Sequence, residues 1–212
     1  MRKKIALASS LLLATLANAE IGQSGFFVGL DISQVDSELK YDNSDSTAYA
    51  YNPYTNNISD NRVSFKAGYQ AYFARIYARY STFDYTDEKR DKFTIKGKVY
   101  ELNADYIPLF YKSENKTWDI RGVFGFGVGY NSSTISDYDT SLLPSGVSGG
   151  SKQNYMEYGY QVGLMSETSI GLSIEAGYRA RYGDLQEFTD GSTSAVFPLT
   201  TEEFYLGINY LF

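Results

Sequence analysis

The chain of 212 residues contains neither cysteine nor histidine and carries a formal net charge of −6. Without cysteine it can build no disulfide framework and no thiolate metal site, and without histidine it lacks the commonest general base and metal ligand. The 21 tyrosines, 13 phenylalanines and 19 glycines, against only 4 prolines, are typical of a β-rich chain. The length is enough for one sizeable domain.

Residues 1–19 have the three parts of a secretory signal peptide. The segment "MRKK" is positively charged, "IALASSLLLATLA" is apolar, and "ANA" provides the small residues of a cleavage site. The apolar run is shorter than the ~20 residues of a membrane-spanning helix. We therefore expect cleavage after Ala19, with a buried N-terminal helix as the alternative interpretation. Residues 20–212 would then form one domain with 16 basic and 25 acidic residues, which is a poor partner for nucleic acid.

Eight segments of the chain alternate between apolar side chains and mixed or polar ones. In the first segment, Phe26, Val28 and Leu30 share one face, while Gly29 and Asp31 share the other. Alternation with a period of two indicates β-strands, and its repetition is a stronger signal than any single segment. The segments are residues 25–34, 62–71, 74–82, 99–106, 118–130, 156–164, 172–182 and 203–212.

The links between these segments alternate in length. Those after the first, third, fifth and seventh segments are mostly long and polar, and those after the second, fourth and sixth are shorter. In an up-and-down antiparallel sheet, this alternation brings all the long links to one end. The expected long links are residues 37–61, 85–94, 131–154 and 183–201, and the expected short links are residues 71–73, 107–117 and 165–169.

Eight antiparallel strands can close into a barrel whose interior is just wide enough for side chains. A soluble lipocalin-like barrel would turn its apolar faces inward, whereas a transmembrane barrel turns them to lipid and its polar faces to the lumen. The apolar faces here carry essentially no charge, and tyrosines gather near the strand ends, where membrane barrels have aromatic girdles. The sequence therefore predicts an all-β fold, an eight-stranded up-and-down antiparallel transmembrane β-barrel.

The mixed faces carry equal numbers of acidic and basic residues. Charges that are removed from water must pair, so a matched count suits a closed lumen filled by ion pairs. We therefore predict a lumen ion-pair network of seven acidic residues, Asp31, Glu101, Asp105, Asp119, Glu157, Glu175 and Glu203, and seven basic residues, Arg62, Lys66, Arg75, Arg79, Arg121, Arg179 and Arg181.

The last segment, "EFYLGINYLF", ends with Tyr210 and Phe212 on its apolar face. This pattern resembles the C-terminal assembly signal of bacterial outer-membrane β-barrel proteins. With the signal peptide and the eight segments, the chain resembles small outer-membrane barrels: the transmembrane domain of outer-membrane protein A, its smaller relatives and the opacity-type, porin-like adhesins. The resemblance implies the outer membrane of a Gram-negative bacterium, with membrane lipid and the outer-membrane assembly machinery as partners. The peptidoglycan-binding activity of the first family is not implied, because the sequence ends at the barrel.

No residue pattern in the sequence indicates an enzyme. Outer-membrane barrels that act as acyltransferases or lipid deacylases use a catalytic histidine, which is absent here. Glu101 and Asp105 could in principle perform acid–base work, but ion pairing explains both residues. The stretch "GVFGFGVGY" lacks the strand–turn–helix context of a phosphate-binding loop, and its inward glycines leave room for neighbouring side chains. We expect no catalytic, cofactor-binding or metal-binding residues.

The sequence predicts a structural barrel whose surface-exposed loops recognise or adhere to a ligand. The Tyr-rich link 37–61 is the most suggestive exposed feature, because tyrosine offers a large contact area at low entropic cost. The Tyr-rich composition of the whole chain explains the same feature equally well. The alternative function is a narrow porin-like channel for small solutes or ions, which a lumen filled with ion pairs disfavours.

Overall fold

The structure is a computed structural model that describes residues 24–40, 42–43, 55–86, 94–115, 117–136, 152–190 and 193–212. Its strands are β1 (Gly25–Lys40), β2 (Asp42–Asn43), β3 (Thr55–Gln70), β4 (Ala74–Thr86), β5 (Thr94–Tyr106), β6 (Leu109–Lys112), β7 (Trp118–Ser136), β8 (Lys152–Thr168), β9 (Leu172–Asp190) and β10 (Thr193–Leu211). Within these ranges no helix is long and apolar enough to cross a membrane. The predicted signal peptide lies outside the described residues, so its cleavage stays a prediction.

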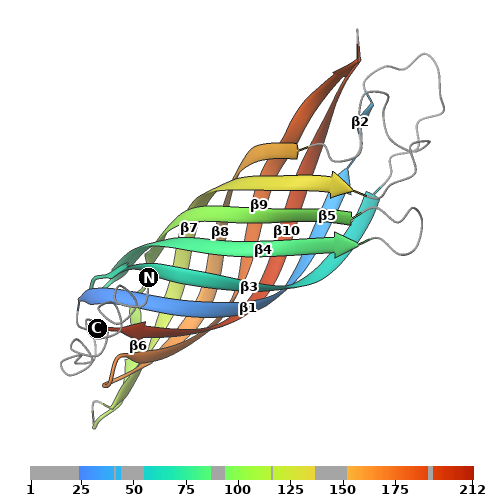
Figure 1. Cartoon of the computed structure of the whole chain (residues 1–212). Helices are drawn as coiled ribbons and strands as arrows, with labels where there is room; N and C mark the ends of the chain where they lie inside the picture. The colour runs from blue at the N-terminus through green and yellow to red at the C-terminus, as the bar shows by residue number, and fades with distance from the viewer. Residues whose placement is uncertain are drawn as a thin grey trace, which may run out of the picture.

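The eight long strands form one closed antiparallel barrel (Figure 1). Neighbours pair in the order β1-β3-β4-β5-β7-β8-β9-β10, and β10 pairs back to β1 from Phe27↔Leu211 to Leu39↔Leu199. The two short strands extend this sheet, since β6 pairs with β7 and β2 pairs with β10. The predicted fold class is therefore confirmed.

The strands are staggered around the barrel axis. A path through directly paired residues starts at Phe26 on β1 and returns to β1 at Asp36, ten residues further along the strand. Strand number and this shear together determine the diameter of a barrel, and eight strands leave an interior that side chains fill. The intermediate residues of the path are Tyr69, Ile76, Ala104, Phe126, Tyr160, Ala180 and Glu202.

Most strands are longer than the alternation predicted. β3 begins at Thr55 rather than Arg62, and β9 runs to Asp190 rather than Tyr182. Towards these strand ends both faces carry polar side chains, so the period-two signal disappears although the backbone ladder continues. The predicted boundaries of the long links are wrong for this reason. Strand residues occur in all four predicted links, which were residues 37–61, 85–94, 131–154 and 183–201.

The short links are closer to expectation. The link 71–73 separates β3 from β4 as predicted, whereas the link 107–117 contains β6. The predicted link 165–169 is wrong, because β8 continues to Thr168 and the turn follows it. Residues 44–54, 87–93 and 137–151, which include most of three predicted surface loops, lie outside the described residues.

Buried and exposed side chains alternate along the long strands. On β1, Phe27 and Asp31 are buried, whereas Phe26 and Leu30 are exposed by 67% and 48%. The buried faces point into the barrel, and the exposed faces form an apolar band around it. Members of the apolar band on all eight strands include Ile32, Phe65, Ile76, Leu102, Phe126, Val162, Ile174 and Leu206.

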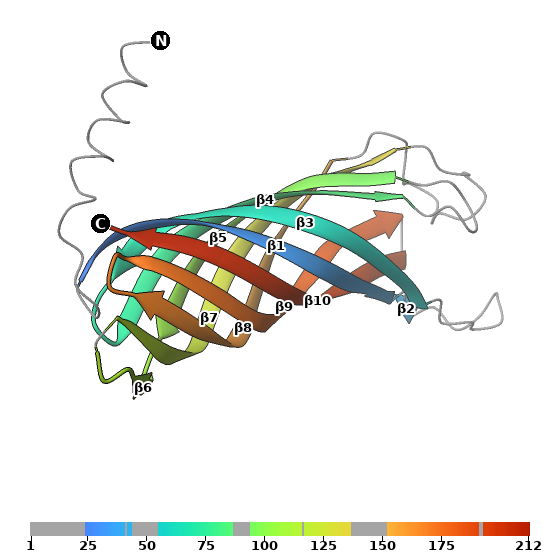
Figure 2. The same cartoon turned by 90° about the horizontal axis from the view of Figure 1, so that it is seen from below.

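The two ends of the barrel differ, and we name them by what they carry. The terminal end holds the first residue of β1, the last residue of β10 and the short turns, as Figure 2 shows for the C-terminus and β1. The loop end is the opposite end. At the terminal end, the Leu211 N–H donates to the Gly171 carbonyl (2.9 Å) and the Phe212 N–H donates to the Phe26 carbonyl (2.8 Å). The backbone of the barrel is thus hydrogen-bonded up to its last residue.

A disulfide between the first and last strands tests this closure. Ile32 and Leu206 face outward and lie opposite each other in the β1–β10 ladder, at a separation that a disulfide spans. The chain has no native cysteine, so we expect the Ile32→Cys/Leu206→Cys variant to form an intramolecular disulfide on oxidation. Denaturing gels with and without reductant measure it as a reversible mobility change.

The control for this experiment is Ile32→Cys/Ile208→Cys, in which the second cysteine is displaced by two residues along the same face of β10. We expect little crosslinking in the control, because diagonal neighbours are ~7–8 Å apart. Equal crosslinking in both variants would contradict the register, and none in the first variant would contradict the closed ladder.

Candidate functional site in the barrel interior

All fourteen residues of the predicted ion-pair network are buried. Their exposed fractions lie between 0% for Asp31, Glu175 and Arg179 and 6% for Arg62 and Glu157. Each of the eight long strands contributes at least one of them, because alternation turns every second side chain into the lumen. The interior is therefore the largest collection of ionisable groups in the described structure, and the arrangement of these groups determines what the lumen can do.

Glu175 is the centre of one cluster. Its carboxylate accepts two hydrogen bonds from the Arg75 guanidinium (2.7 and 2.8 Å) and one from the Tyr205 hydroxyl (2.7 Å), and it lies 3.4 Å from the Lys66 ammonium. Lys66 also pairs with Asp31 at 2.7 Å, and Arg75 pairs with Asp105 at 2.6 Å. The paired hydrogen bonds from the Arg75 guanidinium to the Glu175 carboxylate are of the strong, geometrically specific bidentate kind.

Glu203 and Glu101 hold a second cluster nearer the loop end. Glu203 pairs with Arg79 and, at 2.9 Å, with Arg179. Glu101 accepts from Arg79 at 2.8 Å and from Arg181 at 2.7 Å. The two clusters form one network, because Arg179 also lies 3.4 Å from Asp31 of the first cluster.

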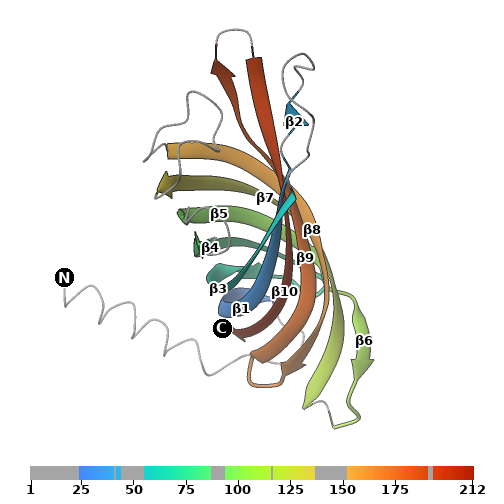
Figure 3. The same cartoon turned by 90° about the vertical axis from the view of Figure 1, so that its right-hand side faces the viewer.

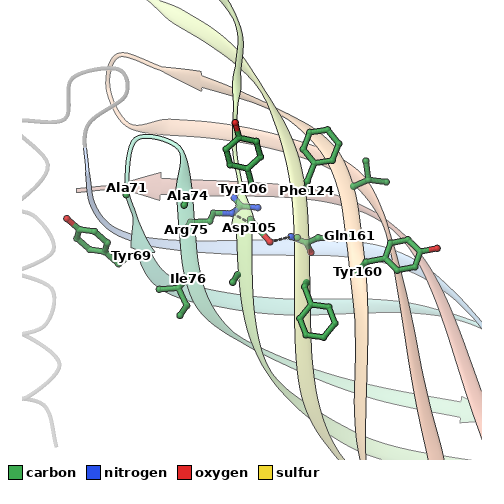
Figure 4. A pocket seen from close by; sticks show the side chains of 14 residues that line it. Tyr69, Ala71, Ala74, Arg75, Ile76, Asp105, Tyr106, Phe124, Tyr160 and Gln161 are labelled. Atoms are coloured by element: carbon green, nitrogen blue, oxygen red, sulfur yellow. Dashed lines mark hydrogen bonds and ion pairs between the residues drawn. The ribbon is translucent and has the colours of Figure 1, made fainter.

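Neutral side chains complete the network, and the sequence analysis missed them. The Gln161 amide donates to Asp105 (2.7 Å) and to the Tyr77 hydroxyl (2.8 Å), and it accepts from Arg179 (2.9 Å). Figure 4 shows this amide reaching Asp105 beside Arg75. The Arg179 guanidinium lies over the Tyr205 ring, with its Cζ 4.3 Å from the ring centroid, which is a cation–π distance. Counting charges alone could not find these residues, although they stand on the same inward faces.

A third group lies at the terminal end. The Arg121 guanidinium pairs with Asp119 (2.9 Å) and Glu167 (3.2 Å) and donates to the Tyr72 carbonyl (2.5 Å). Glu167, which is 1% exposed, was missed because the sequence analysis assigned it to a link. With Glu167 the buried charged residues of the described structure are eight acidic and seven basic, so the equal count of the prediction was wrong by one carboxylate.

Apolar side chains close the lumen on both sides of the main network. Towards the terminal end, Phe27, Tyr77 and Leu211 form one buried cluster, and Ile107, Val123 and Met165 form another. Towards the loop end, the apolar side chains of Val35, Phe83, Val99 and Tyr155 are buried beside Arg62 and Glu157. Because these layers separate the charges from water, each ion pair stands in a low-dielectric interior, where an unpaired charge would be costly.

The glycines of "GVFGFGVGY" have a structural role. A Cβ at Gly127 would lie 3.0 Å from Cγ of Asn103 and 3.1 Å from Nη2 of Arg181, and one at Gly129 would lie 2.7 Å from Cγ of Glu157. Long side chains of neighbouring strands therefore occupy the space that these glycines leave. This agrees with the expectation that the stretch is not a phosphate-binding loop.

The outer surface carries a groove of about 820 Å³ across β4, β5 and β7 (Figure 4). Aromatic side chains, among them Tyr69, Tyr106 and Phe124, border it, and small residues such as Ala74 and Ala104 leave the space open. Its lining is almost entirely apolar, and the charged residues Arg75 and Asp105 that reach it are already paired with each other. It is a depression in the apolar band, without groups for catalysis.

The arrangement of the lumen favours a structural role. The acidic groups of both central clusters accept from two or more basic or neutral donors, which leaves no carboxylate in them poised as a base. Among the described residues no group of three or more acidic side chains is placed to hold a metal ion. At the C-terminus, the rings of Tyr210 and Phe212 lie 5.5 Å apart, and their role as an assembly signal stays a prediction.

Comparison with known proteins identifies the fold. No family model and no curated protein matches the chain. Among solved structures, the chain is similar to Neisserial surface protein A, with 19% identity and a TM-score of 0.52 over 89% of this chain and 99% of that one. It is also similar to the outer membrane protein AlkL, with 14% identity and a TM-score of 0.51 over 92% of each chain. The fold is that of the small outer-membrane β-barrels.

Removing one buried carboxylate tests the energetic role of the network. We expect Glu175→Gln to lower the free energy of unfolding by about 3–5 kcal/mol, because Arg75 and Lys66 lose their shared counter-charge. Urea unfolding in lipid vesicles, followed by the fluorescence of Trp118, measures the change. Glu202→Gln, at an exposed position on β10, is the matched control and is expected to change stability by no more than about 0.5 kcal/mol. Equal effects of the two variants would contradict the network.

Proposed function

We propose that the chain is an integral outer-membrane β-barrel of a Gram-negative bacterium, exported by a cleaved signal peptide. In this proposal the ion-paired lumen is a structural plug, and the loop end faces the cell exterior, where it recognises or adheres to a surface ligand. Membrane lipid surrounds the barrel, and the assembly machinery recognises its C-terminal strand through Tyr210 and Phe212.

The observation that carries the proposal is the inverted distribution of polarity. Among the described residues, fifteen charged side chains are buried in the barrel, while large apolar side chains such as Phe26, Phe65 and Met156 are more than half exposed outside it. A water-soluble protein rarely exposes a contiguous apolar patch larger than a few hundred Å², and this apolar band encircles the whole barrel. In a lipid bilayer the apolar outward faces contact hydrocarbon and the charged inward faces remain shielded in the lumen, so both are in a favourable environment.

Exposed aromatic residues border the apolar band at both ends. Tyr100, Tyr130 and Tyr158 lie towards the loop end and are exposed by 49%, 43% and 59%. Tyr111 and Trp118 lie at the terminal end, with ring centroids 5.3 Å apart. Amphipathic rings favour the two membrane–water interfaces, so these residues support a membrane-spanning orientation.

The strands extend beyond the apolar band at the loop end, and this extension supports a role in recognition. The outward residues there are polar and exposed, for example Gln34 and Asp36 on β1 and Lys98 on β5. A rigid sheet thus carries the connecting segments away from the membrane surface, and binding residues are commonly found on loops that a rigid scaffold positions.

A measurement of conductance distinguishes the plugged lumen from the alternative function, a narrow porin-like channel. Because ion pairs and apolar layers fill the lumen, we expect planar-bilayer recordings of the purified protein to show no steady conductance. A known porin reconstituted in the same way is the positive control. A steady, sizeable current that follows the protein concentration would contradict the plug and favour the channel.

Cysteine labelling of whole cells tests the location and the orientation. With a membrane-impermeant maleimide, we expect Asp36→Cys at the loop end to react in intact cells and Glu114→Cys at the terminal end to react only after permeabilisation. Leu102→Cys, in the apolar band, should resist the reagent in both conditions. If Glu114→Cys alone reacted in intact cells, the orientation would be the opposite of the one proposed. Ready labelling of Leu102→Cys would contradict the lipid-facing band.

A further inference from the structure

Two backbone ladders stop before their strands do. The β3–β4 ladder runs from Gln70↔Arg75 only to Ser64↔Ser81, although β3 begins at Thr55 and β4 continues to Thr86. The β8–β9 ladder likewise stops at Glu157↔Gly183, although both strands continue towards the loop end.

The other ladders continue to the ends of their strands. The β1–β3 ladder reaches Lys40↔Thr55, and the β4–β5 ladder reaches Thr86↔Thr94. The loop-end halves of the strands therefore form two four-stranded sheets, β9-β10-β1-β3 and β4-β5-β7-β8. Figure 3 shows the two sheets diverging from each other. We use the name β3–β4 cleft for the interval beyond Ser64↔Ser81 in which β3 and β4 share no ladder, and β8–β9 cleft for the interval beyond Glu157↔Gly183 on the opposite side.

At the base of the β3–β4 cleft, side chains from the two strands still meet. The Arg62 guanidinium lies 5.3 Å from the centre of the Phe83 ring. Beyond this contact the strands continue without a shared ladder, as Thr55–Asn61 on β3 and Asp84–Thr86 on β4. The Asn61 N–H donates to the carboxylate of its own neighbour, Asp60, at 2.7 Å.

Where β3 has no ladder with β4, residues Thr55–Asn61 form a sheet edge. The main-chain N–H and C=O groups along a sheet edge are a template for pairing with another strand. Natural proteins block exposed edges with charged residues, especially lysine, with proline or with a bulge. The β3 edge in Thr55–Asn61 has no lysine, no proline and no bulge, since its ladder with β1 is continuous, and its one charged residue is Asp60. The β8–β9 cleft is better protected, because Lys152 lies on β8 and the register of β10 against β9 shifts between Ala195 and Phe197. The two clefts are therefore not equivalent.

The β3–β4 cleft is also accessible to water. Asn61, Thr82 and Asp84 point outward beside it and are exposed, and none of them belongs to the apolar band. An edge in water can bind an extended peptide through main-chain hydrogen bonds, which is the strand-addition mode of recognition.

We propose that the β3–β4 cleft is a strand-addition site, at which the edge of β3 binds an extended peptide segment of a partner protein. This inference rests on the proposed function, because it needs the loop end to face the exterior. The main chain of the peptide supplies the hydrogen bonds, and its alternate side chains point into the cleft and to solvent. The partner is thus recognised by its extended conformation more than by any single side chain.

The test uses a fluorescein-labelled peptide that copies Ala78–Thr86, the strand whose ladder with β3 ends early. We expect the purified barrel in lipid nanodiscs to raise the fluorescence anisotropy of the peptide. The peptide should slow amide hydrogen exchange in Thr55–Asn61, while a peptide with N-methylated alternate amides should do neither. Absence of both effects with the unmodified peptide would overturn the proposal, as would equal binding of the two peptides.

A disulfide across the cleft provides the matched variant. Asn61→Cys/Asp84→Cys continues the β3–β4 register and closes the cleft on oxidation, which we expect to abolish peptide binding until reductant is added. Gln34→Cys/Asn61→Cys shares one substitution but joins β3 to its existing partner β1, and we expect it to bind normally. Loss of binding in both oxidised variants, or in neither, would overturn the assignment to this cleft.

The outcomes of the two proposals are distinguishable. A barrel that passes the whole-cell labelling test but ignores the peptide overturns the strand-addition site alone. Free reaction of the Leu102→Cys variant in intact cells would contradict the lipid-facing band, and with it the proposed function, whatever the result with the peptide.

Discussion

The pairing of β10 with β1 is the constraint on which the rest of the structure depends. In hydrocarbon every backbone N–H and C=O must find a partner within the protein, and a sheet meets this condition only by closing on itself. Closure with eight strands then leaves a lumen that side chains fill. The polar character of the interior is a consequence of this geometry, since lipid requires apolar residues on the outside and alternation leaves the polar ones for the inside.

In the interior, buried acidic and basic side chains offset each other's charge by forming ion pairs. Glu175 and Glu203 each contact two basic residues, and Gln161, Tyr77 and Tyr205 satisfy hydrogen bonds that the charged groups leave open. A few buried atoms, such as Nε of Arg79 and Nδ2 of Asn103, have no hydrogen-bond partner among the described residues, but most of the charged groups are held by two or more partners, and networks of this kind rigidify a core. A rigid interior suits a scaffold, because it fixes the strands that extend beyond the apolar band at the loop end.

Much of the fold was predictable from alternation, because the lipid face and the lumen face differ sharply in the middle of each strand. Glu175 and Arg179 were assigned to the lumen from their position in a period-two pattern alone. Glu167 keeps the inward phase of β8 but was missed, because near the rim an apolar residue, Met165, points inward and a polar one, Ser166, is exposed, so that residues 165–169 were assigned to a link. The pairing partners were beyond prediction, since contacts such as Arg79 with Glu203 depend on how far the strands are staggered. The early ends of two ladders were not predicted either, because the alternation of a single strand does not show where its pairing with a neighbour ends.

The ion pairs that cross the lumen also bear on how the barrel forms. Arg79 on β4 meets Glu203 on β10, and Arg75 on β4 meets Glu175 on β9, so each pair joins residues at least 100 positions apart in the chain. In a sheet that has curled but not yet closed, Arg75 and Arg79 would keep their partners on the neighbouring strand, Asp105 and Glu101, but would lack these second carboxylates in a poorly solvated space. Half-assembled intermediates are therefore penalised, and addition of the final strand brings Glu203 to both Arg79 and Arg179.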